Sequence, residues 1–78
     1  MSDAPPLRAF FWDFFGPRAE QTAIHFRKHL EQFIDQHALA GCETGVESAQ
    51  PGHFAAFCRA PQTHEEALVA ALRPQRML

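Results

Sequence analysis

Apolar residues follow two different periods along the chain, and each change of period marks the boundary of a predicted element. Residues 7–15 are rich in aromatic side chains, which suit a pleated and buried surface, so this stretch predicts a strand. From Arg18 to about Leu39 the apolar residues recur at spacings of four and three, which is a helical period. Between the two, Gly16-Pro17 ends the strand and places a proline at the expected first helical position. Gly41 is the predicted left-handed cap of the helix.

The second half of the chain predicts a hairpin and a short helix. Residues 42–48 and 53–59 form the two expected strands of the hairpin, and Pro51-Gly52 between them fits the centre of a type II turn. Thr63 and Glu66 have the spacing of a capping box at the start of a helix that ends before Pro74. The last residues, 75–78, are a tail that could add a fragment of strand.

The order of these elements is β-α-β-β-α, which predicts an α+β fold. The simplest arrangement is a three-stranded, antiparallel-containing sheet with both helices on one face, because each helix has an apolar stripe to bury. This topology resembles a ferredoxin-like fold that lacks its last strand, and topology alone implies no function. We expect one domain over residues 1–78, with a flexible leader at 1–6 and the tail at 75–78.

The first strand is aromatic on both of its faces. Alternation places Phe10, Trp12 and Phe14 on one face and further apolar residues on the other. If the helices cover only one face, one of the two sets meets water, and an aromatic patch of that kind is usually an interface. We therefore predict Phe10, Trp12 and Phe14 as an interface or ligand-binding surface. A second copy in a homodimer is the favoured occupant, and a protein partner or a small apolar ligand are the others. The alternative is that leader and tail cover this face.

Size and charge narrow the classes of function. A chain of 78 residues buries a thin core, and small domains of this kind often rely on a partner subunit. The net charge is −2 and the basic residues are scattered, so we expect no binding to nucleic acid. No apolar stretch predicts a membrane span or a secretory signal, so the expected location is the cytoplasm. Cys42 and Cys58 are expected to be free thiols, and the uncertain hairpin register leaves open whether they share a face.

No catalytic motif occurs in the sequence, so we expect a non-enzymatic protein without cofactor or bound metal. The alternative is a small metal-binding protein or enzyme that uses Asp13 together with surface histidines. A carboxylate set among aromatic residues could act as an acid or base if it is buried. His25 and His29 are four residues apart on the predicted helix and could share a metal, and His53 follows the hairpin turn.

Overall fold

The computed structural model describes residues 6–78, which form a sheet of four strands and two α-helices. In chain order the elements are β1 (Leu7–Phe15), α1 (Ala19–Gln36), β2 (Glu43–Gln50), β3 (His53–Pro61), a 3-10 turn (Gln62–His64), α2 (Glu65–Leu72) and β4 (Arg76–Met77). The leader expected at 1–6 lies outside the described residues except for Pro6, whose carbonyl accepts a hydrogen bond from the Gln62 amide. No helix formed by residues 6–78 combines the length and apolar character needed to cross a membrane.

The sheet has four antiparallel strands in the order β2-β3-β1-β4, and not the three that the sequence predicted. The additional strand comes from the tail, where the sequence allowed a fragment of strand. Phe10 pairs with Met77 there, and Phe11 pairs with Arg76. Leu78 continues this pairing, because its amide and carbonyl both bond to Ala9. Two residues are too few to show a strand period in a sequence, so the tertiary pairing with β1 decides their conformation.

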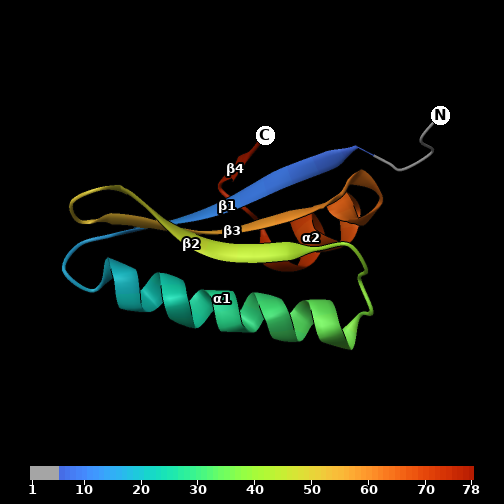
Figure 1. Ribbon diagram of the computed structural model, residues 1–78, viewed down its shortest axis with the longest axis horizontal. Helices are drawn as coiled ribbons and strands as arrows, with labels where there is room; N and C mark the ends of the chain where they lie inside the picture. Colours follow the sequence, from blue (N-terminus) through green and yellow to red (C-terminus); the bar gives the residue numbers. More distant parts are fainter. Residues whose placement is uncertain (1–5) are drawn as a thin grey trace.

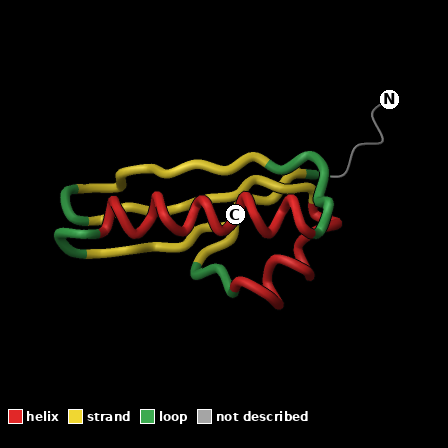
Figure 2. Tube along the Cα trace, turned by 90° about the horizontal axis from the view of Figure 1, so that it is seen from below, coloured by secondary structure: helices red, strands yellow, loops and turns green. Residues whose placement is uncertain are grey.

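Both helices cover the same face of the sheet, as expected. Figure 1 shows α1 and α2 on one side of the strands, and Figure 2 views the molecule from the side of the helices. The core fills the space between these two layers. Few of its side chains are both large and fully buried; they are Phe10, Leu30, Leu68 and Cys58. Helix α1 also contributes Ala19 and Ala23 to the buried set, and its small residues let it approach the sheet closely.

Helix α1 ends three residues before the expected position, and its cap is not Gly41. The backbone turns into the left-handed region at Ala38, whose φ is 52°. The amide of Leu39 then donates to the Ile34 carbonyl and that of Ala38 to the Asp35 carbonyl, which is the Schellman pattern. Leu39 packs against the core beyond this cap. Gly41 also has a positive φ, of 80°, but it belongs to the loop that leads into β2.

Two predicted helix starts were also wrong in detail. Arg18 is the N-cap of α1, so Pro17 precedes the cap and does not occupy the first helical position. The capping box of Thr63 and Glu66 is absent, because Thr63 lies in the 3-10 turn and α2 begins after His64 without a side-chain cap. The hairpin prediction holds: Pro51-Gly52 forms the turn, and Gly52 has a φ of 77°.

Candidate functional site

The face of the sheet opposite the helices is not covered by any element of residues 6–78. Arg8 contacts Glu65 of α2, and Trp12 and Phe14 pack on Phe26 of α1, so the even-numbered residues of β1 face the helices. The odd-numbered residues and their cross-strand neighbours form the opposite surface, which we call the open face. Its members include Glu43, Gly45, Glu47, His53, Ala55, Phe57, Arg59, Pro61, Leu7, Ala9, Phe11, Asp13, Phe15 and Arg76.

The three residues predicted as a binding surface lie on the helix side. Phe10 is fully buried and Trp12 is 4% exposed, while Phe14 is half-buried. The Trp12 indole Nε1 donates a hydrogen bond of 2.8 Å to the carbonyl of Leu72, at the end of α2. These aromatic rings therefore hold the helices to the sheet within one copy. Of the two faces that β1 offers, the structure leaves the one with Phe11 and Phe15 uncovered by helices.

An aromatic pair flanked by arginines occupies the centre of the open face. Phe11 of β1 and Phe57 of β3 are direct cross-strand neighbours, with ring centroids 6.3 Å apart. The guanidinium of Arg76 lies 4.5 Å from the centroid of Phe11, and that of Arg59 lies 5.0 Å from the centroid of Phe57. Such stacking is a cation–π contact and shields the rings in part from water. Phe11 is accordingly only 8% exposed, although no helix covers it.

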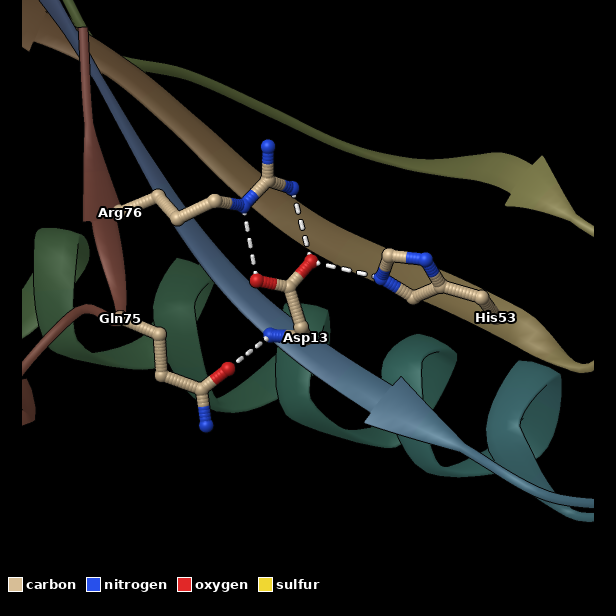
Figure 3. A network of polar contacts seen from close by, with 4 residues as sticks. All are labelled: Asp13, His53, Gln75 and Arg76. Atoms are coloured by element: carbon tan, nitrogen blue, oxygen red, sulfur yellow. Dashed lines mark hydrogen bonds and ion pairs between the residues drawn. The ribbon is translucent and has the colours of Figure 1, made fainter.

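Beside this pair, Asp13 is the centre of a polar network (Figure 3). Arg76 donates to both carboxylate oxygens of Asp13, from Nε at 2.8 Å and from Nη2 at 2.7 Å. His53 donates to Oδ1 from its Nε2 at 2.9 Å. The arginine and the imidazole approach the carboxylate from opposite sides, and the side chain of Asp13 is left 9% exposed. The network thus joins three strands, β1, β3 and β4.

The backbone of Asp13 adds a link to the residue before β4, because its amide donates to the side-chain oxygen of Gln75 at 2.7 Å. The hydrogen bonds from Arg76 hold the pKa of the Asp13 carboxyl below its ordinary value; burial opposes this shift and His53 supports it. The same contact raises the pKa of Arg76. Asp13 is therefore ionised at neutral pH and anchors β4 to the sheet. A buried carboxylate without a partner would instead have a raised pKa.

His53 is the histidine that the fold brings to Asp13. Its ring stacks on Phe15 with the centroids 4.4 Å apart and an interplanar angle of 20°. A histidine held by a carboxylate at one ring nitrogen has a fixed orientation, and its second nitrogen stays available as a hydrogen-bonding group. The sequence named Asp13 and His53 as candidates but not Arg76, because the pairing of the tail with β1 had no sequence signal.

The other candidate groups do not join this network. On α1, His25 and His29 place their Nε2 atoms 3.0 Å apart, where one nitrogen donates to the other. No cluster of three or more potential metal ligands among His, Cys, Asp and Glu occurs within residues 6–78. Cys42 and Cys58 are free thiols, and they interact with each other on the helix side of the sheet. The two cysteines therefore share a face, which the sequence left open. Burial raises the pKa of the Cys58 thiol to about 12 and also raises that of Cys42.

Comparison with known proteins adds no assignment, since no family model, no curated protein and no solved structure matches this chain. An aromatic pair, two stacked arginines, exposed acids on β2 and a carboxylate-held histidine share one sheet face that the helices do not cover.

Proposed function

We propose that this protein is a non-catalytic homodimeric module in which the open faces of two copies pack against each other. The single observation that carries the proposal is the uncovered sheet face, which combines aromatic side chains with charges of both signs. We further assign the chain to one ferredoxin-like domain, since its β-α-β-β-α-β order and its β2-β3-β1-β4 sheet fit that arrangement. The two free thiols favour a reducing location such as the cytoplasm.

The thin core supports a partner on this face. Only a handful of large side chains are fully buried between the helices and the sheet, and small domains with such cores commonly gain stability by association. The size of the open face fits a small interface. Strands β1 and β3 have 9 residues each and so extend about 30 Å at about 3.3 Å per residue. With strands about 4.8 Å apart, the face covers roughly 400–600 Å², which is below the footprint of about 800 Å² per partner of a standard interface.

Phe15 is expected to contribute the most to the free energy of association. It lies at the end of β1 on the open face and is 72% exposed in one copy. A covered phenylalanine buries about 150–250 Å², so covering the exposed part removes about 110–180 Å² from water. At about 25 cal/mol per Å², this corresponds to about 3–4.5 kcal/mol per copy before the entropic cost of association. Leu7, at the other end of the strand, is 63% exposed and adds to the same face.

Native mass spectrometry and sedimentation velocity of the full chain test this function. The wild-type protein is expected to be a dimer at micromolar concentration, and Phe15→Ser is expected to raise the dimer dissociation constant at least tenfold. The control is Ile24→Ser, which removes an exposed apolar side chain from α1, on the other side of the molecule; Ile24 is 43% exposed. A wild-type monomer at 100-fold higher concentration would overturn the proposal. A bound protein or organic mass in place of the second copy would also reject the homodimer.

The contact between Asp13 and His53 favours a second candidate function, acid–base catalysis. His53 is oriented by the carboxylate at 2.9 Å and could transfer a proton through its other ring nitrogen, Nδ1. The test is hydrolysis of an activated ester by the wild type, by His53→Gln and by the control His64→Gln. Catalysis by the oriented imidazole requires that His53→Gln removes most of the rate while His64→Gln keeps it. Equal and small losses for both variants would exclude a special role for His53.

A further inference from the structure

A pair of histidines lies on the outer surface of α1, apart from the network of Asp13. His25 and His29 are separated by one helical turn, and both residues are exposed. Because α1 covers the other face of the sheet, this surface lies on the side of the molecule away from the open face (Figure 1). The pair is therefore accessible whether or not the open face is covered, and the proposed dimer gives it no role.

The two imidazoles approach each other through nitrogen atoms that can bind a metal. The Nε2 atoms of His25 and His29 are 3.0 Å apart, and the rings meet edge to face at an interplanar angle of 73°. In a neutral pair one Nε2–H donates to the other nitrogen, so a single proton lies between them. When the donor ring carries its proton on Nδ1 instead, both Nε2 lone pairs are free. Neutral imidazole in this form is the commonest metal ligand in proteins.

The distance between the two nitrogens favours one coordination geometry. Histidine nitrogens bind a metal ion such as zinc at about 2.0–2.1 Å, so two nitrogens 3.0 Å apart subtend an angle of about 91–97° at a shared ion. This angle matches neighbouring ligands at right angles in a square-planar or octahedral complex. A tetrahedral ion would need the nitrogens about 3.3–3.4 Å apart at the same bond lengths. Tetragonal coordination by nitrogen and oxygen is typical of Cu²⁺ and Ni²⁺.

The number of protein ligands indicates the same class of ion. Within residues 6–78, no further His, Cys, Asp or Glu joins the pair to make a group of three. Zinc sites usually have three or four protein ligands, so two imidazoles are too few for a typical one. The polar residues one turn away on α1 are Gln21, Lys28 and Gln32, and none of them supplies an anionic ligand. Cu²⁺ and Ni²⁺ stand near the top of the divalent affinity series for such nitrogen sites.

We propose that His25 and His29 form a two-nitrogen chelate for a divalent ion of the Ni²⁺ and Cu²⁺ class, with water in the remaining coordination positions. This site is independent of the proposed dimer. Asp13, which the sequence grouped with these histidines, lies on the open face and takes no part in it. A bound ion links the two ends of one turn of α1. It should therefore raise the melting temperature, because a ligand that binds only the folded state stabilises that state.

Calorimetric titration of the untagged full chain with NiCl₂ tests the site; Ni²⁺ is chosen because the free thiols do not reduce it. We expect one Ni²⁺ per chain and a melting temperature that rises with added NiCl₂. His25→Gln and His29→Gln should each raise the dissociation constant about tenfold or more, since even the outer partners of a metal site contribute about 10–100-fold. The matched control is His37→Gln, which should bind Ni²⁺ as the wild type does. His37 is also exposed, but its ring contacts Phe33 and not another histidine.

Two double variants separate chelation from the number of histidines, and both use exposed positions of α1. Gln21→His with His29→Gln moves the pair one turn earlier at the same spacing, so it should restore Ni²⁺ binding. Gln32→His with His29→Gln keeps the same number of histidines but places them two turns apart, so it should not. Equal binding by the two double variants, or wild-type affinity in His25→Gln, would show histidines that act singly and would overturn the chelate. A folded wild-type chain that binds no Ni²⁺ would overturn it as well.

Discussion

Replacing Asp13 by asparagine should loosen β4 from the sheet. The carboxylate accepts two hydrogen bonds from Arg76 and one from His53, at 2.7–2.9 Å. Hydrogen bonds that involve a charged group contribute about 1.5–3 kcal/mol each, but the Arg76 side chain is half exposed and water replaces part of the loss. Asparagine also keeps one acceptor oxygen. We therefore expect Asp13→Asn to lower the free energy of unfolding by about 2 kcal/mol, or the melting temperature by about 10 °C.

The matched control is Glu43→Gln, which breaks an ion pair of the same length in an exposed place. Glu43 and Arg59 are 2.8 Å apart, with side-chain exposures of 69% and 54%. Exposed pairs contribute about 0–1 kcal/mol, so this variant should melt within a few degrees of the wild type. Hydrogen exchange locates the effect: the amides of Ala9 and Leu78, which bond across β1 and β4, should lose protection only in Asp13→Asn. Equal losses of stability in the two variants would refute this account of the network.

The pH dependence gives an independent test of the same residue. Because the folded-state pKa of Asp13 is lowered, its contribution is complete above the ordinary carboxyl pKa of 3.8 and disappears as pH falls through the lower folded value. The stability difference between wild type and Asp13→Asn should therefore be constant from pH 7 to about pH 5 and shrink below pH 3.8. Denaturant unfolding at a series of pH values measures it. A difference that stays constant down to pH 2 would exclude an ionised Asp13 as its cause.

Three further predictions concern the cap, the core and the thiols. Ala38→Gly should raise the free energy of unfolding by about 0.5–1 kcal/mol, because it relieves a left-handed alanine, whereas Gly41→Ala should lower it; thermal melts decide the signs. Trp12→Ala should cost about 3–5 kcal/mol through the lost ring and its hydrogen bond to α2, and denaturant titration that found less than 1 kcal/mol would contradict its core position. Cys58, whose pKa is raised to about 12, should resist alkylation at pH 8 in the native state, and rapid labelling seen by mass spectrometry would contradict its burial.

The local elements were predictable from the sequence because strong periods and turn residues determine them. The aromatic run of β1, the four-three spacing of α1 and the Pro51-Gly52 turn each gave the correct element. Helix ends were less predictable, because Ala38 and Gly41 both offer a left-handed position after α1. Ala38 became the cap, since capping there lets Leu39 pack against the core. The burial of Leu39 thus outweighs the backbone preference of Gly41.

The candidate site was only half predictable, for a reason that lies in its topology. Asp13 and His53 are far apart in the sequence. Asp13 was a candidate because it lies among aromatic residues, and His53 was a candidate histidine after the hairpin turn. Arg76 completes the site only because residues 76–77 add an edge strand to β1, and a pairing of this length has no signature in the chain. The open face of β1 was not predictable either, because both faces are aromatic. The prediction chose Phe10, Trp12 and Phe14, and the structure places these residues on the helix side.

The position of Asp13 links stability to association in a way that follows from these contacts. The carboxylate holds Arg76 over Phe11, and so it fixes the guanidinium on the open face that the proposed dimer would cover. Removing the carboxylate would free Arg76 and His53 together and would also detach the edge strand that carries the arginine. Loss of Asp13 should therefore weaken the dimer more than its local hydrogen bonds account for, whereas loss of Phe15 should weaken the dimer and leave the fold of each copy intact. The two residues lie two positions apart on one strand, yet in the proposed dimer Asp13 would position a charged group and Phe15 would supply covered apolar surface.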